Sequence, residues 1–173
     1  MICRKALSIK VTDVAPVCVD WDQLTWGVPV VGGLNPAFNG YTFTPAPTVA
    51  AATFHATAYN NDLQFHNLQF QVDAFVSFSS LVACNAEMTL DLSIIYPTDP
   101  HAVSGSVKAI RMDTFATLVD SGTLNGSSAN HIVLPIAVPA GTYQIRVRVL
   151  FGLNDFLDPG AGTIDLEGTF ANV

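Results

Sequence analysis

The side chains that could bind a metal are few in this chain and lie far apart. Four histidines are present, His55, His66, His101 and His131. They form neither an HxH nor an HExxH pattern, so no two of them are spaced to hold one zinc ion from a single strand or helix. Isolated histidines of this kind usually serve as polar or capping residues. We therefore expect no metal centre built on histidine.

The three cysteines, Cys3, Cys18 and Cys84, are an odd number and contain no CxxC pair. This pattern gives no zinc-site spacing and argues against a disulfide framework. Free cysteines of this kind behave as small buried hydrophobic residues. We expect three unpaired thiols, which suits a protein made in a reducing cytosol.

Two acidic segments deserve comparison with known sites. In LNDFLDPG, Asn154, Asp155 and Asp158 offer oxygens to Ca²⁺, but without EF-hand spacing, and Asn and Asp before Pro-Gly also suit a turn. Whether the loop 153–161 binds Ca²⁺ stays open. Asp20-Trp21-Asp22 places two carboxyls beside an aromatic ring, as a sugar platform or glycosidase would. On a strand both acids would point away from Trp21, so we interpret this as a surface segment.

No nucleophile or phosphate-binding pattern is present. The sequence contains no GxSxG, SxxK, GxGxxG or Walker A motif and no Cys–His signature. We therefore predict no catalytic residue and no cofactor, and we expect that the protein is not an enzyme.

Four basic residues lie in segments whose pattern predicts a strand. Arg146 and Arg148 alternate on one face of a strong strand, and Lys108 and Arg111 occur on another candidate. With Asp165 and Glu167 on the last strand they would form cross-strand ion pairs; the alternative is an anion-binding stripe. So few cations on an acidic chain favour the ion pairs.

The elements that must position these residues are strands, because apolar residues recur at every second position. The strong predictions are 68–78, 87–95, 132–138, 142–151 and 163–170. Weaker candidates are 6–12, 17–20, 28–31, 41–44, 52–59, 106–112 and 115–120, and the best helical candidate is a turn or two within 60–68. This count predicts an all-β fold, a two-sheet antiparallel β-sandwich. We favour a jelly roll over an immunoglobulin-like fold, whose Cys…Trp…Cys signature is absent.

The clearest turn is Val138-Pro139-Ala140-Gly141-Thr142. Proline presets the first turn position and glycine supplies a positive φ. We expect this turn to pair 132–138 with 142–151 as a hairpin. Pro135 places the first of these strands at a sheet edge or bulge.

Charge is scarce: 12% of residues are charged, 50% are hydrophobic, and the net charge is −7. An ordinary domain carries about 25% charged residues, so we expect much of the surface to be covered by other protein. No apolar run approaches the roughly 20 residues of a membrane span, and the N-terminus lacks the apolar region of a secretory signal.

We divide the chain into an arm and proline-rich wrap, residues 1–50, and a jelly-roll sandwich, residues 51–173. The arm carries Arg4, Lys5 and Lys10, three of the seven cations. It is the one part for which we consider contact with nucleic acid, because the remaining chain is acidic. We expect the arm and wrap to tie subunits together.

The layout of MICRKALSIK, then VPVVGGLNPAFNGYTFTPAP, then strands from 52 to 170 resembles viral jelly-roll coat subunits. In size the chain is similar to vertex (penton-type) proteins of icosahedral phages and to phage spike heads. GTYQIRVRVLFG also looks like a strand of trimeric tumour-necrosis-factor or C1q-like domains, but the remaining C1q-like pattern is absent.

The resemblance implies a non-enzymatic virion structural protein, a bacteriophage-type capsid protein in a symmetric homo-oligomer. Its expected partners are copies of itself and other coat proteins, and its expected location is the virion, after synthesis in the host cytoplasm. The alternative is a receptor- or carbohydrate-binding spike head. That function would expose Tyr, Trp and Asn in the loops at 96–104, 125–131 and 153–161, toward a host receptor or glycan.

Overall fold

The computed structural model describes residues 17–34, 36, 39–48, 50–60, 67–95, 103–124, 130–154 and 162–173. Its elements are the 3₁₀ helix η1 (Trp21–Gln23) and the strands β1 (Thr25–Trp26), β2 (Val30–Gly32), β3 (Asn39–Pro47), β4 (Ala51–Asn60), β5 (Asn67–Ser80), β6 (Cys84–Ile95), β7 (Val103–Arg111), β8 (Thr117–Asp120), β9 (Asn130–Val138), β10 (Gly141–Asn154) and β11 (Gly162–Asn172). Within these residues, no helix has the length and apolar character needed to cross a bilayer.

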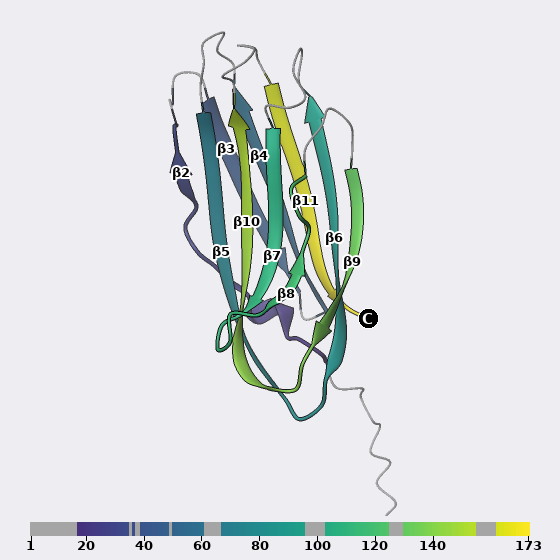
Figure 1. The fold of residues 1–173 in the computed structure, drawn as a ribbon. Coiled ribbons are helices and arrows are strands. Elements are labelled where there is room, and N and C mark those ends of the chain that lie inside the picture. Colours follow the sequence, from purple (N-terminus) through teal and green to yellow (C-terminus); the bar gives the residue numbers. More distant parts are fainter. Residues whose placement is uncertain are drawn as a thin grey trace, which may run out of the picture.

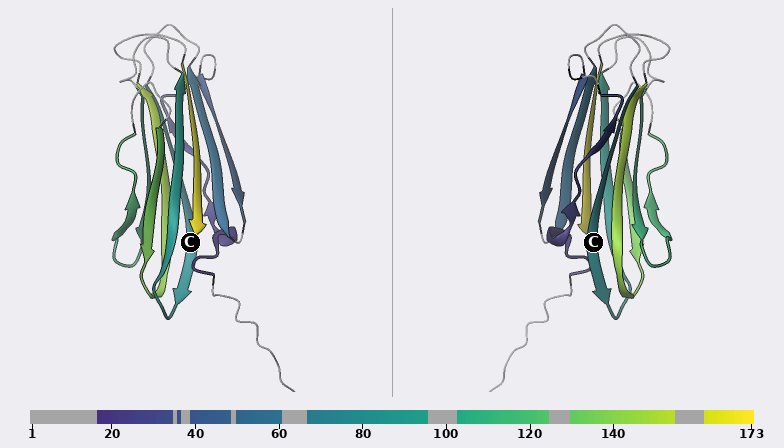
Figure 2. Two further views of the ribbon diagram at one scale, coloured as in Figure 1. Left: turned by 90° about the vertical axis from the view of Figure 1, so that its right-hand side faces the viewer. Right: turned by 90° about the vertical axis from the view of Figure 1, so that its left-hand side faces the viewer.

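The strands form two antiparallel sheets that face each other (Figures 1 and 2). Sheet A has the order β1-β5-β10-β7-β8, with β2 also paired to β5, and sheet B has the order β3-β4-β11-β6-β9. Counted from β4, the eight strands give the orders 1-8-3-6 and 2-7-4-5, the double Greek key of a jelly roll. The predicted fold class is confirmed.

The core lies between the sheets, and the period-2 pattern explains it. On β5 the even-numbered residues from Leu68 to Phe78 are buried, and on β10 the odd-numbered residues from Tyr143 to Phe151 are buried. Aromatic rings bridge the layers, with the ring centroids of Tyr41 in sheet B and Phe70 in sheet A 5.2 Å apart. Phe75 is an apolar residue at an odd-numbered position of β5, and it lies on the outer face opposite Arg146 and Thr25.

The expectation of three unpaired thiols was wrong. Cys18 and Cys84 form a disulfide, with Cα atoms 5.6 Å apart. The bond joins the segment before η1 to the start of β6, 66 residues away in sequence. No local pattern signals such a pair, because only the folded topology brings the two residues together.

The segment between the disulfide and β1 also departs from the predicted strand at 17–20. The chain there is irregular and then enters η1. Asn172 holds it: its Oδ1 accepts from the Val19 backbone nitrogen at 3.0 Å and from Trp21 Nε1 at 3.1 Å. Its Nδ2 donates to the Val19 carbonyl oxygen at 2.8 Å. Both ends of the described chain are therefore linked.

The proline-rich stretch contributes sheet structure. The weak candidates at 28–31 and 41–44 correspond to β2 and β3. β3, which contains Pro45 and Pro47, is an edge strand and pairs only with β4. At an edge, the missing N–H donor of proline is tolerated.

The candidate strand at 6–12 and most of the helical candidate at 60–68 fall outside the described residues. The division at residue 50 stays a prediction.

The predicted hairpin of 132–138 with 142–151 was wrong. β9 pairs with β6 in sheet B, whereas β10 pairs with β5 and β7 in sheet A. The turn exists, with Gly141 at φ 139°, but it carries the chain from one sheet to the other. Turn residues specify that a chain reverses, not which strand it then bonds. The edge position expected from Pro135 is confirmed, since β9 ends sheet B.

Candidate functional site

The outer face of sheet A contains a groove with a volume of about 490 Å³, a size typical of small-ligand sites. The register aligns Val30, Gln71, Leu150 and Ser106 in one row across β2, β5, β10 and β7. Thr123 extends the row, because its neighbour Leu124 is bridged to Gly105. Five backbones at the normal strand spacing make the row about 19 Å long.

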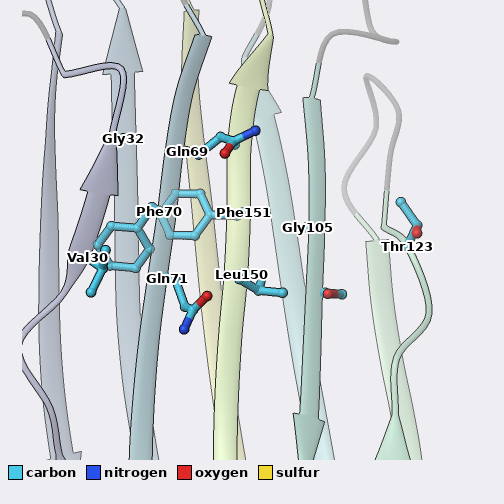
Figure 3. A pocket seen from close by; sticks show the side chains of 11 residues that line it. Val30, Gly32, Gln69, Phe70, Gln71, Gly105, Thr123, Leu150 and Phe151 are labelled. Carbon is cyan, nitrogen blue, oxygen red and sulfur yellow. The ribbon is translucent and has the colours of Figure 1, made fainter.

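The next row explains why the surface is hollow. Gly32, Gln69 and Gly152 lie side by side there on β2, β5 and β10, so two of these three strands have no side chain at this level. A Cβ on Gly152 would come within 2.9 Å of the Leu68 carbonyl oxygen, whereas one on Gly32 would meet nothing within 4 Å. The missing side chains of Gly32 and Gly152 thus leave the hollow in one row, and the side chains of the row from Val30 to Thr123 bound it (Figure 3).

The lining is uncharged. Eleven residues line the groove, namely Val30, Gly32, Gln69, Phe70, Gln71, Gly105, Ser106, Thr123, Leu150, Phe151 and Gly152. Phe70 and Phe151 have buried rings that pack on each other in the core. The polar groups are amides and hydroxyls, which both donate and accept, beside the apolar surfaces of Val30 and Leu150.

A polar network fixes one of these amides. Arg148 Nε and Nη2 donate to Asp73 Oδ1 and Oδ2 at 2.7 and 2.8 Å. Gln71 Nε2 also donates to Asp73 Oδ2, at 3.1 Å. Because its NH₂ group is engaged there, Gln71 retains its carbonyl oxygen as an acceptor at the groove.

A row of charges borders the groove on the side of Gln71. The register places Asp73, Arg148, Lys108 and Asp120 next to one another on four strands. Lys108 Nζ lies 2.7 Å from Asp120 Oδ2, so each cation of the row has its own carboxylate. These hydrogen bonds lower the pKa of Asp73 and of Asp120, in each case mainly through the cation, against the opposing effect of burial.

Cross-strand ion pairs form for Arg148 and Lys108, but the prediction that Asp165 and Glu167 would be the partners was wrong. Arg148 and Lys108 pair with Asp73 and Asp120, and Arg111 binds Asp113. Asp165 and Glu167 are on β11 in sheet B, the opposite layer, so they are out of reach. Arg146 Nε is buried and has no hydrogen-bond partner.

The outer face of sheet B carries two histidine–carboxylate pairs. His55 Nε2 lies 2.6 Å from Asp165, and His131 Nδ1 lies 2.6 Å from Asp91. These histidines are thus paired rather than isolated. Among the described residues, no three His, Cys, Asp or Glu side chains are grouped as metal ligands would be. His66 and His101 fall outside those residues.

Some of the remaining predicted features lie in the described residues, and the others lie mostly outside them. Trp21 is buried, its ring centroid 5.4 Å from that of Phe170, while Asp20 and Asp22 are exposed. No sugar platform is formed there. Asp155 and Asp158 of the calcium candidate, and most of the loops proposed for receptor contact at 96–104, 125–131 and 153–161, are outside the described residues.

Sequence reasoning missed the groove. Its one local signal is Gly152, which directly follows the predicted strand 142–151 and lies inside β10, because glycine within a strand often marks a close approach of another backbone. Gly32, which lies level with Gly152, becomes relevant only through the pairing of β2 with β5.

No family model and no curated protein matches the chain. Solved structures resemble it at low sequence identity. TmCBM61 in complex with beta-1,4-galactotriose shares 8% identity with a TM-score of 0.45, over 77% of this chain and 88% of that one. The enzymatically active domain of tailspike protein 4 from bacteriophage CBA120 shares 12%, with a TM-score of 0.39, over 80% of this chain and 20% of that one. Infectious bursal disease virus, Gx strain, shares 8%, with a TM-score of 0.39, over 87% and 32%.

Proposed function

We propose that the protein is a non-enzymatic binding module that holds a neutral glycan chain in the groove on sheet A. The observation that carries this proposal is the uncharged lining of a groove bordered by a charge row that neutralises itself. A sugar presents hydroxyls at its edges and C–H groups on its faces. Amide and hydroxyl groups beside Val30 and Leu150 match both kinds of surface.

The length of the groove favours an oligosaccharide over a single sugar. The row from Val30 to Thr123 crosses five backbones, about 19 Å at normal strand spacing. A charged ligand in the groove would compete with the Asp73–Arg148 and Lys108–Asp120 pairs for the charges that border it. A neutral chain needs no such change, and Gln71 is already oriented to accept from it.

The test is a glycan array followed by calorimetry, with one variant that fills the groove. Gly32→Phe adds a ring where a Cβ meets nothing within 4 Å, so the fold tolerates it while the groove is occupied. Ser77→Phe, on the outer face of β5 but outside the groove, is the matched control. We expect the wild type and the control to bind the same glycan and Gly32→Phe to lose at least tenfold in affinity. Equal binding by all three, or no binding by the wild type, contradicts the proposal.

A second candidate is a jelly-roll subunit of a symmetric virion assembly, with other coat proteins as partners. Scarce charge and exposed apolar turns favour it, and jelly rolls serve in both viral capsid and lectin domains. Incorporation into particles tests it: removing residues 1–12 should block incorporation and leave a folded sandwich. Normal incorporation of the shortened chain would contradict an arm-tied subunit. Both functions fit one chain, since a virion surface subunit can also bind a host glycan.

A further inference from the structure

Exposed apolar side chains gather on two chain connections at one end of the sandwich. Leu81 and Val82, between β5 and β6, are 100% and 60% exposed, and Phe115, between β7 and β8, is 70% exposed. We call these three residues the apolar tips. Both connections lie at the lower end in Figure 1, with the β9–β10 turn. Large apolar residues exposed together mark an interaction site more often than chance surface composition.

The tips are close enough to belong to one interface. Ser80 is opposite Gly141, and Arg111 is opposite Ile145, on strands that flank β10. Two strand spacings and four residues of rise put the bases of the two connections about 16 Å apart. A typical interface patch of about 800 Å² per partner covers that distance.

Hydrogen bonds hold the connection that carries Phe115. Arg111 donates to both carboxylate oxygens of Asp113, at 2.6 and 2.7 Å. The same guanidinium lies 4.0 Å from the ring centroid of Tyr143, whose hydroxyl donates to the Pro139 carbonyl oxygen at 2.5 Å. Phe115 has φ +57°, a conformation that costs energy for a residue with a large side chain. The surroundings therefore fix Phe115 in an exposed position.

The connection that carries Leu81 and Val82 is fixed as well. Ser80 Oγ donates to the Val82 carbonyl oxygen at 2.9 Å and accepts from the Val82 backbone nitrogen at 3.3 Å. The disulfide at Cys84 follows two residues later. Tips that are ordered before binding lose little entropy when a partner covers them.

The partner that fits this end is the N-terminal arm. Cys18 is bonded to Cys84, so residues 1–16 join the described chain next to the connection that carries Leu81 and Val82. Arg4, Lys5 and Lys10 against Asp13 give residues 1–16 a net charge of +2, which leaves −9 on the rest of the chain. Ile2, Leu7, Ile9 and Val11 add apolar side chains. A basic, apolar segment complements an acidic domain that exposes apolar tips.

Acidic groups near the entry of the arm strengthen the match. Asp20 and Asp22 are both exposed, and the hydrogen bond between their side chains raises the pKa of Asp20. Two carboxylates so close together repel each other, so a cation that approaches them stabilises both. Asp113 adds a third exposed carboxylate beside Phe115, although Arg111 already binds it.

The length of the arm bears on whether a copy binds its own arm or the arm of a second copy. Leu81 is only three residues from Cys84, so a fold-back within one copy would place residues 13–16 at the tips. Lys10, seven residues before Val17, lies up to about 25 Å further along an extended chain. An arm extended to that length would place its basic residues past the tips of its own copy. We propose that the apolar tips of one copy bind residues 2–12 of a second copy, and that two such contacts close a symmetric dimer.

Cross-linking tests the contact, because the arm carries Cys3 and the fold uses only the other two cysteines. Leu81→Cys places a thiol on a fully exposed tip; Val28→Cys, also exposed but in the stretch before β2, is the control. Under mild oxidation we expect a disulfide-linked dimer with Leu81→Cys, and none with Val28→Cys or with Cys3→Ser combined with Leu81→Cys. A link within one copy overturns the second-copy proposal and assigns the tips to the protein's own arm.

Solution mass gives an independent readout. Light scattering of the wild type should show at least twice the 18.4 kDa of one chain at high concentration. Leu81→Ser with Phe115→Ser, and separately removal of residues 1–16, should shift it to the monomer, while Val28→Ser should not. A wild type that stays monomeric overturns the proposal. So does a monomer that sediments with phosphatidylcholine vesicles through Leu81 and Phe115, which would make a lipid surface the partner. Neither result bears on the glycan groove.

Discussion

Arg148 on β10 binds Asp73 on β5 through two parallel hydrogen bonds of 2.7 and 2.8 Å between directly opposite residues of the sheet. A bidentate guanidinium–carboxylate pair is more directional than a single contact. Both side chains are less than a third exposed. The pair therefore stabilises the fold and also fixes the Gln71 amide at the rim of the groove.

The first prediction concerns acid stability. The hydrogen bond from Arg148 lowers the pKa of Asp73 in the folded protein. The stabilisation is therefore fully present above the unfolded-state value of about 4 and is lost as the pH falls through the lower folded-state pKa. Asp73→Asn should reduce the free energy of unfolding at pH 7 by about 1–2 kcal/mol, and the difference from wild type should shrink at acidic pH. Urea denaturation at both pH values measures this.

Asp113→Asn is the matched control for that experiment. Asp113 also binds an arginine through two hydrogen bonds, which lower its pKa, but it is exposed in a turn. Solvent screening makes its contribution smaller. An equal loss of stability in the two variants would show that burial in the charge row does not matter.

The second prediction separates binding from stability at the groove. Gln71→Leu keeps the side-chain volume but removes the oriented carbonyl oxygen, leaving an apolar group. Glycan affinity should fall about tenfold, which corresponds to one hydrogen bond of about 1.4 kcal/mol. The free energy of unfolding should fall only by the lost Gln71–Asp73 hydrogen bond, about 0.5–1.5 kcal/mol, because the Asp73–Arg148 pair remains. Calorimetry against the glycan found with the wild type measures the loss, and unchanged affinity would remove Gln71 from the site.

The reasons for success and failure of the sequence predictions are physical. β5 and β10 were predictable because a strand with one buried face must alternate apolar and polar residues. The sheet to which each strand belongs depends on contacts remote in sequence, so the turn at Pro139–Gly141 suggested a hairpin that does not exist. The groove depends on the register that places Gly32 level with Gly152, and no local pattern encodes it.

The third prediction tests the disulfide. After denaturation without reductant, titration should find one reactive thiol, Cys3, and after reduction it should find three. Cys84→Ser should lower the free energy of unfolding by about 2–4 kcal/mol, because the bond closes a long loop in the unfolded chain. Cys3→Ser is the control and should leave stability unchanged. Three thiols in the untreated protein would mean that the bond does not form.

The last prediction concerns Asn172, which links the two ends of the described chain. Its side chain pairs the Val19 backbone nitrogen, the Val19 carbonyl oxygen and the indole nitrogen of the buried Trp21. Asn172→Leu leaves these groups without a partner, and a single buried unsatisfied group costs about 1–3 kcal/mol. Denaturation followed by tryptophan fluorescence should show a loss of at least that size, while Asn85→Leu at a nearby exposed position should not. If the two variants unfold alike, the disulfide alone holds the segment and the Asn172 network adds nothing to stability.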